Sequence, residues 1–183
     1  MNNLIQKLAM FVTISMVALS VCDANANEKI SPYVDGSKSF LEIKDVNRQA
    51  EAWAMCAATY DVMAEILSES QPARSQQLKE LANGAEVTVT MAIVSDGLTP
   101  DITQDRFNAL WSMAQLSGTE LPRTRRTMLA ADEESSAGEK AKEFFSNLSA
   151  TMEICFKNLE GQQMYIDLWR ELAKSGLLQM PKE

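Results

Sequence analysis

Apolar residues recur every three to four positions between Asp45 and Gly176, which is the repeat of an amphipathic α-helix. β-Branched residues alternate over Val87–Thr90, but the helical repeat resumes on both sides of this short stretch. No other stretch of the sequence offers it a partner strand, so we interpret it as helix. The pattern predicts an all-α fold over residues 45–176, a compact bundle of about five to six helices joined by short loops.

Capping residues, prolines and glycines predict the ends of the first two helices. Asp45 is expected to cap the first helix, and Pro72 to stand in the first turn of the second. Gly97 is expected to end the second helix, since glycine is favoured just beyond a helix C-terminus. Gly84 lies inside this helix at a cost of about 1 kcal/mol relative to alanine, so we expect another helix to cross closely there.

The middle of the chain predicts two more helices and one loop. Thr99–Asp101 combines a capping hydroxyl, a proline and an acid, and it is expected to start a third helix that stops at Gly118. A shorter helix should follow over Leu121–Ala131. The polar segment Asp132–Gly138 should then form a flexible loop.

A long helix is expected from Glu139 to about Leu159, with Gly161 either breaking or bending it before an amphipathic segment continues to Gly176. The inward positions of this helix are predicted to be Phe145, Leu148, Met152, Cys155 and Leu159. Residues 177–183 are expected to form a short tail.

Residues 1–26 have the three parts of a bacterial secretory signal peptide. Lys7 supplies the positive charge, Leu8–Cys22 is mostly apolar, and Ala24–Ala26 has the small-x-small pattern of a cleavage site. An uncleaved membrane anchor is the alternative, but the apolar run is shorter than the about 20 residues that a spanning helix needs. We therefore expect cleavage after Ala26 and a periplasmic or secreted protein.

Leu19–Cys22 also resembles a bacterial lipidation box, although a branched valine precedes the cysteine. The minor alternative is therefore a lipoprotein, and we expect membrane attachment only if Cys22 is lipidated. In the main interpretation, an extended lead-in over residues 27–44 follows the cleavage site. It mixes proline, glycine and serine with isolated apolar residues, and it should be ordered only where Phe40, Leu41 and Ile43 dock on the helices.

Two cysteines, Cys56 and Cys155, remain after cleavage, and each falls on the apolar stripe of a predicted helix. In an oxidising compartment a small, even number of cysteines favours a disulfide, and two separately buried thiols are the alternative. Neither cysteine has the Cys-x-x-Cys spacing of a redox catalyst. We expect a structural disulfide that joins the first long helix to a late one.

The charge and composition exclude several classes of function. The chain has 183 residues, a formal charge of −8 and no histidine. The acidic balance argues against nucleic-acid binding, which needs a positive surface. Without histidine, a Ser-His-Asp triad and histidine-ligated metals are excluded. No glycine-rich phosphate loop or calcium loop occurs either, so we expect no catalytic, cofactor-binding or metal-binding residues.

Two groups of charged residues remain as candidates for a functional site. Asp61 and Glu65 lie one turn apart, and paired carboxyl groups perform glycoside hydrolysis; an ordinary charged helix face is the alternative. Arg123, Arg125 and Arg126 form the only concentrated positive charge, and they could contact an anionic partner. Their simpler interpretation is neutralisation by the acidic run seven residues later.

These observations favour a non-enzymatic protein that binds a protein partner in the cell envelope, as an accessory subunit, inhibitor, immunity protein or chaperone. The alternatives are a carboxylate-dependent hydrolase acting on cell-wall material and a lipid-anchored envelope component. The hydrolase predicts a carboxyl group of raised pKa in a cleft. The lipid-anchored form predicts a mature chain that starts at a modified Cys22.

Overall fold

The computed structural model describes residues 31–178, so the signal peptide expected over residues 1–26 lies outside the described part. Within residues 31–178 there are five α-helices, one short 3-10 helix and no strand, which confirms the all-α prediction. The elements are η1 (Phe40–Glu42), α2 (Val46–Ile66), α3 (Pro72–Gly97), α4 (Gln104–Glu134), α5 (Glu139–Lys157) and α6 (Leu159–Ser175).

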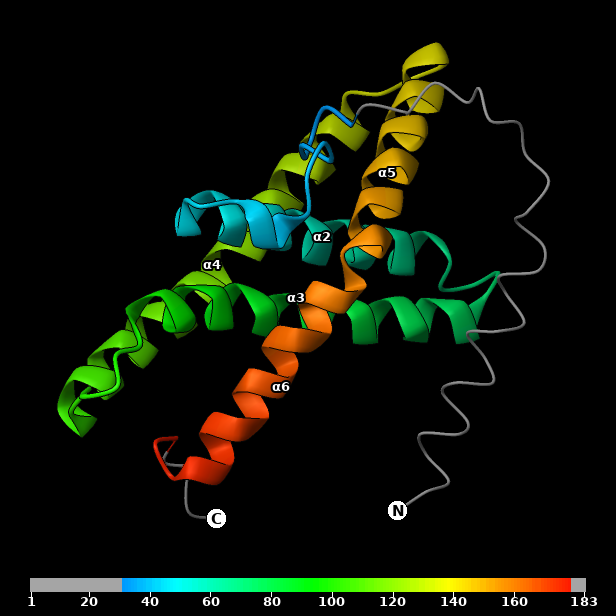
Figure 1. Ribbon diagram of the computed structural model, residues 1–183. Coiled ribbons are helices and arrows are strands. Elements are labelled where there is room, and N and C mark those ends of the chain that lie inside the picture. Colours follow the sequence, from blue (N-terminus) through cyan, green and yellow to red (C-terminus); the bar gives the residue numbers. More distant parts are fainter. Residues whose placement is uncertain (1–30, 179–183) are drawn as a thin grey trace.

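The helices are arranged in three layers (Figure 1). In the middle, α2 and α3 lie antiparallel and share the most extensive helix–helix contact of the described chain. α4 crosses one side of this hairpin and contacts both of its helices. α5 and α6 follow one diagonal across the other side, where α5 contacts α2 and α6 contacts α3. The hairpin is therefore enclosed between two long outer layers.

α2 is the central helix, and it is buried on all sides over most of its length. Every residue from Ala52 to Tyr60 is buried. A helix that is apolar all round belongs in the interior of a fold, and small side chains let its neighbours approach closely. The buried small residues of this helix are Ala50, Ala52, Ala54, Ala57, Ala58 and Ala64.

Four of the predicted helix ends are confirmed, one of which is the end of α3 at Gly97. Asp45 Oδ1 accepts hydrogen bonds from the backbone N–H groups of Asn47 and Arg48, with N···O distances of 2.9 and 3.3 Å. Pro72 is the first residue of α3. Gly176 follows α6 with a φ of 81°, the left-handed conformation that glycine adopts without strain.

The close helix crossing expected at Gly84 is also confirmed. A Cβ atom at this position would collide with the side-chain amide of Gln162, which lies on α6. The absent side chain lets α6 lie directly against α3. Val87–Thr90 is part of the same helix, so the strand alternative is wrong.

The predicted start of the third helix is wrong. Thr99–Asp101 leads into a turn, in which the Ile102 N–H donates to the carbonyl oxygen of Thr99 at 3.1 Å. α4 begins at Gln104, and Thr103 caps it by accepting from the backbone N–H of Arg106 at 3.4 Å. Thr99 and Thr103 can both cap a helix, and the proline after Thr99 led to the wrong choice between them.

The predicted break at Gly118 is wrong as well, because α4 is a single helix of 31 residues. A Cβ atom at Gly118 would collide with Thr90 Oγ1 and would lie 3.5 Å from the carbonyl oxygen of Glu86, both on α3. The glycine therefore allows two helices to approach, and it does not end one. Pro122 is buried in the same helix, where packing on α2 and α3 overrides its helix-breaking tendency. Only Ser135–Gly138 remains of the predicted loop.

α5 and α6 meet at Asn158, whereas the expected break point, Gly161, lies within the first turn of α6. The Asn158 side chain stabilises this junction. Its Nδ2 donates to the carbonyl oxygen of Ile154 at 2.9 Å, and its Oδ1 accepts from the backbone N–H of Phe40 at 2.8 Å. One amide thus joins the helix junction to the lead-in.

The inward face of α5 is confirmed only in part, because Met152 is half-buried and Leu159, also half-buried, is the first residue of α6. Phe144 is buried, whereas Phe145, which was predicted to point inward, is 45% exposed. Neighbouring residues of a helix point about 100° apart, so a shift of one position changes which ring enters the core. Leu148 and Cys155 are fully buried, as predicted.

The lead-in is held on the helices by buried contacts of Phe40. Its ring lies at 87° to the ring of Trp53, with the two centroids 4.9 Å apart. Gln49 Nε2 donates to the Phe40 carbonyl oxygen at 2.7 Å, and the Tyr165 hydroxyl donates to Gln49 Oε1 at 2.9 Å. The docking expected for Phe40 is confirmed, Ile43 is half-buried, and Leu41 is 40% exposed.

Candidate functional site

Cys56 in α2 and Cys155 near the end of α5 form the predicted pair. Their sulfur atoms lie 1.99 Å apart, their Cα atoms lie 5.6 Å apart, and both side chains are fully buried. The bond spans 99 positions of the sequence and ties the central helix to an outer layer. Because neither sulfur is exposed, this arrangement fits a structural role.

The three arginines considered as contacts for an anionic partner all lie in α4, and they pair with different carboxylates of this chain. Arg123 pairs with Glu120, one turn earlier in the same helix. Arg125 Nη2 lies 3.0 Å from Glu51 Oε2 on α2. The carboxylates that pair with them therefore come from α2 and from the same turn of α4, and not from the acidic run at the end of α4.

Arg126 lies among carboxylates between α2, α3 and α4. Its Nη2 is 2.5 Å from Glu65 Oε1, and its Nη1 is buried without a hydrogen-bond partner. Burial raises the pKa of the Asp61 carboxyl group, although the positive charges of Arg126 and Lys79 oppose this shift. Burial also raises the pKa of Glu86, and the nearby charge of Asp61 raises it further. A carboxyl group that keeps its proton to higher pH can act as a general acid.

Glu86 was not among the predicted site residues. Its only signal in the sequence is that it is a charged residue between Ala85 and Val87, in a mostly apolar part of α3. The structure brings it to Asp61 from a different helix, and the charged neighbour that was predicted for Asp61, Glu65, is directed to Arg126. Periodicity within one helix could not reveal a pairing between two helices.

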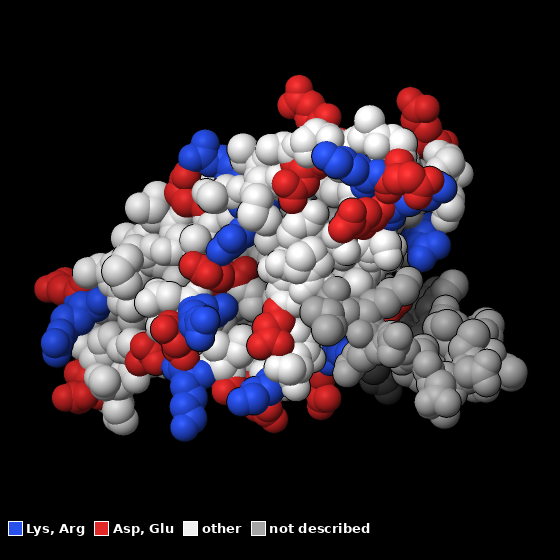
Figure 2. Space-filling model, turned by 90° about the horizontal axis from the view of Figure 1, so that it is seen from above, with Lys and Arg blue, Asp and Glu red and all other residues white. Residues whose placement is uncertain are grey.

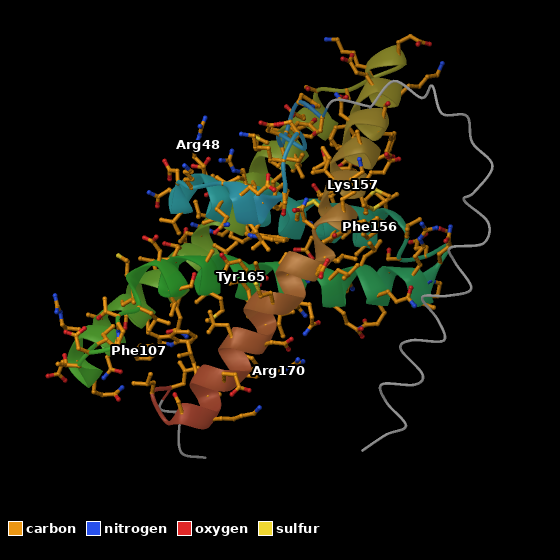
Figure 3. All side chains as sticks on the ribbon, in the orientation of Figure 1. Arg48, Phe107, Phe156, Lys157, Tyr165 and Arg170 are labelled. Atoms are coloured by element: carbon orange, nitrogen blue, oxygen red, sulfur yellow. A yellow bond between two sulfur atoms is a disulfide. The ribbon has the colours of Figure 1, made fainter. Side chains whose placement is uncertain are left out.

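A cavity of about 230 Å³ lies between the lead-in, the first turns of α2 and the middle of α4. Arg48 and Arg125 line it, and in Figure 3 Arg48 extends from the edge of α2 away from α3 and α6. Arg48 forms no ion pair within residues 31–178, although its charge contributes to lowering the pKa of Asp35. The main cause of that lowered pKa is hydrogen bonding from Ser37, whose N–H donates to Asp35 Oδ1 at 2.9 Å.

Tyr33 lines the same cavity from the lead-in. Burial and a hydrogen bond to Asp132 raise the pKa of its hydroxyl to about 12. The hydroxyl therefore stays protonated at neutral pH. Like Glu86, Tyr33 was not predicted from the sequence, because the lead-in carries no periodic pattern that would mark its side chain.

The surface is mixed in charge but carries a stripe of apolar side chains. Figure 2 shows basic and acidic side chains interspersed over one face of the molecule, with no large area of one sign. On the solvent side of α4, Ala109, Met113 and Leu116 form what we call the α4 stripe; all three are exposed, Met113 by 56% and Leu116 by 65%. Residues at these spacings lie on one side of a helix.

Within the described residues, no group of three acidic or cysteine side chains converges as metal ligands would. A search of residues 31–178 for a helix both long and apolar enough to cross a membrane finds none. No protein-family model matches the chain, and neither a curated protein nor a solved structure is similar to it.

Proposed function

We propose that the protein is exported through its N-terminal segment and acts without catalysis, by binding a protein partner in the bacterial cell envelope. The observation that carries the binding role is the α4 stripe. Met113 and Leu116 are more than half exposed although both are large and apolar. Anchors at positions i, i+4 and i+7 of one helix are the pattern by which helices dock in grooves of other proteins.

The cysteine pair supports the exported half of the proposal. Disulfides persist in the periplasm and outside the cell, and they are rare in the reducing cytosol. Cys56 and Cys155 lie at bonding distance in the interior. An accessory subunit, an inhibitor, an immunity protein and a chaperone would all bind a partner in this way, and the identity of the partner separates them.

Crosslinking and affinity capture from the native envelope fraction test the binding role. We expect the wild-type protein to capture one stoichiometric partner, and the double variant Met113→Glu/Leu116→Glu to lose it. Met164→Glu is the matched control, because Met164 is a methionine of α6 that is 50% exposed. Equal capture by the stripe variant would contradict the role of the stripe, and capture of no partner by any form would contradict the binding function.

The mass of the mature N-terminus tests export. A chain that begins at Asn27 is the expected product, since cleavage is predicted after Ala26. A chain that begins at Cys22 and carries the mass of acyl groups would establish the lipid-anchored form instead. An intact Met1 in the assembled protein would contradict both forms of processing.

A second candidate is a carboxylate-dependent hydrolase acting on cell-wall material, and the raised pKa values of Asp61 and Glu86 are the observation that favours it. It predicts turnover of cell-wall fragments that Asp61→Asn and Glu86→Gln abolish without unfolding the protein. Unchanged turnover in both variants, or no turnover by the wild type, would reject it. We prefer the binding role because the cavity described above is lined by Arg48 and Arg125 and by neither Asp61 nor Glu86.

A further inference from the structure

The cavity between the lead-in, α2 and α4 is rich in hydrogen-bond donors. Arg48 and Arg125 each bring a guanidinium group with several N–H donors. The two carboxylates of the lining already accept interactions, Asp35 from the Ser37 N–H and Glu51 from Arg125. The lining carries two positive and two negative side chains, and among them the Arg48 guanidinium keeps its N–H donors without an ion pair in residues 31–178. A ligand that accepts hydrogen bonds and carries negative charge would therefore pair with Arg48.

The rest of the lining restricts the body of that ligand. Val34, Ile43 and Ala52 supply aliphatic surface beside the two arginines. The volume of about 230 Å³ is below the roughly 300–1,000 Å³ of pockets that hold drug-sized ligands. A group of about one amino-acid residue fits this space better than a nucleotide or a sugar chain does.

We propose that this cavity binds a carboxylate attached to a short branched aliphatic group, as in a leucine at the C-terminal end of a peptide, with Arg48 and Arg125 donating to the carboxylate. Guanidinium groups hold carboxylates through paired, charge-assisted hydrogen bonds. The aliphatic group then lies on Val34 and Ile43. If the bound carboxylate is the C-terminus of a protein partner, this inference rests on the proposed function. It then identifies the C-terminus of the partner as one of the groups that contact this chain.

Two probes separate the possible sources of the carboxylate. N-acetyl-leucine presents the group as a small free acid, and an acetylated pentapeptide ending in leucine presents it as a chain end. The amide form of each probe has the same aliphatic group without the charge. We expect calorimetric titration of the purified protein to show binding of at least one acid, and binding about tenfold weaker or lost for its amide. Equal binding of acid and amide, or no binding of either acid, would overturn the proposal.

An arginine in the same position of another helix provides a matched control. Arg48 is the third residue of α2 and Arg106 is the third residue of α4, and both are exposed and have their backbone N–H groups capped. Arg48→Gln should weaken binding of the acid probe about tenfold, and Arg106→Gln should leave it unchanged. An equal loss of affinity in the two variants would show that binding depends only on the net charge of the protein. This result would overturn the proposed site.

Affinity capture distinguishes failure of this inference from failure of the proposed function. If the acid probes do not bind while the wild-type protein still captures its envelope partner, the cavity proposal fails and the binding function stands. If the pentapeptide binds more tightly than N-acetyl-leucine, the chain end is the ligand, and Arg48→Gln should then also reduce capture of the partner. Capture that is unaffected by Arg48→Gln would overturn the chain-end form.

Discussion

Asn158 joins the lead-in to the end of α5 through one side chain. It lies where α5 ends and α6 begins, it accepts from the backbone of Phe40, and it donates to the carbonyl oxygen of Ile154. A buried backbone group that loses its partner costs more than the bond itself contributed. No sequence pattern marked this residue, because one of its partners lies 118 positions earlier in the chain and the other lies four positions earlier.

We therefore expect Asn158→Ala to lower the free energy of unfolding by about 1–3 kcal/mol, since it leaves the Phe40 N–H and the Ile154 carbonyl oxygen without a partner. Urea denaturation measures this loss. Asn83→Ala is the control, because Asn83 is an exposed asparagine within α3, where alanine is the better helix former. Similar losses in both variants would contradict the role of Asn158.

We expect Asp61 to make the stability of the protein depend on pH. Burial raises its pKa in the folded protein above the value of about 3.9 in an unfolded chain, so the folded state binds the proton more tightly. The free energy of unfolding should therefore increase as pH falls through the folded pKa, and the gain should be complete below the unfolded pKa.

The melting temperature, followed from pH 7 to below the unfolded pKa of about 3.9, tests this dependence. The wild type should gain more on acidification than Asp61→Asn, which cannot bind the proton. Asp101→Asn, which removes a carboxylate at an exposed position before α4, is the control. If Asp61→Asn keeps the full response of the wild type, the dependence comes from other groups.

At the scale of the elements, glycines mark contacts between helices. Gly84 lies against Gln162 of α6, and Gly118 lies against Thr90 of α3. The helix crossing at Gly84 was predicted correctly from the sequence, whereas Gly118 was wrongly predicted to end a helix. Both residues are glycines within a helical pattern, so the local sequence does not distinguish a helix crossing from a helix end. Only the position of the neighbouring helix does.

Gly118→Ala tests this interpretation of α4. Alanine is the better helix former, so a helix end or an unconstrained helix would be stabilised by the change or little affected. We expect instead a loss of about 1–3 kcal/mol, because the new Cβ would overlap the Thr90 side chain. Thr90→Ala should restore most of this loss in the double variant, as measured by urea denaturation. Losses that simply add would contradict a direct contact.

Most of the helices could be predicted from periodicity and caps, since Asp45, Pro72 and Gly176 act locally. The candidate site could be predicted only in part. Arg125 was singled out by charge, but its cavity also needs Arg48 and Tyr33, which come from the start of α2 and from the lead-in. Such residues meet only through packing of elements distant in the sequence, which a local pattern does not contain.

At the scale of the whole molecule, the disulfide is the one side-chain cross-link between the central helix and an outer layer in residues 31–178. We expect Cys56→Ser and Cys155→Ser each to lower the free energy of unfolding by a similar amount, about 4–5 kcal/mol in the chain-entropy estimate for a loop of this length. The double variant should lose little more than either single variant. Urea denaturation of all three checks this, and fully additive losses would mean that the sulfurs act separately.

The bond also makes the chain between positions 56 and 155 a closed ring that contains the Ser135–Gly138 turn. A protease that cuts once after Glu133 or Glu134 would open the backbone without releasing a fragment, because each half keeps one cysteine of the pair. The nicked protein would migrate as a single band on a gel without reductant and as two bands with it. Damage at this turn would therefore be missed by a gel run without reductant, and the intact mass would change only by the one water that hydrolysis adds.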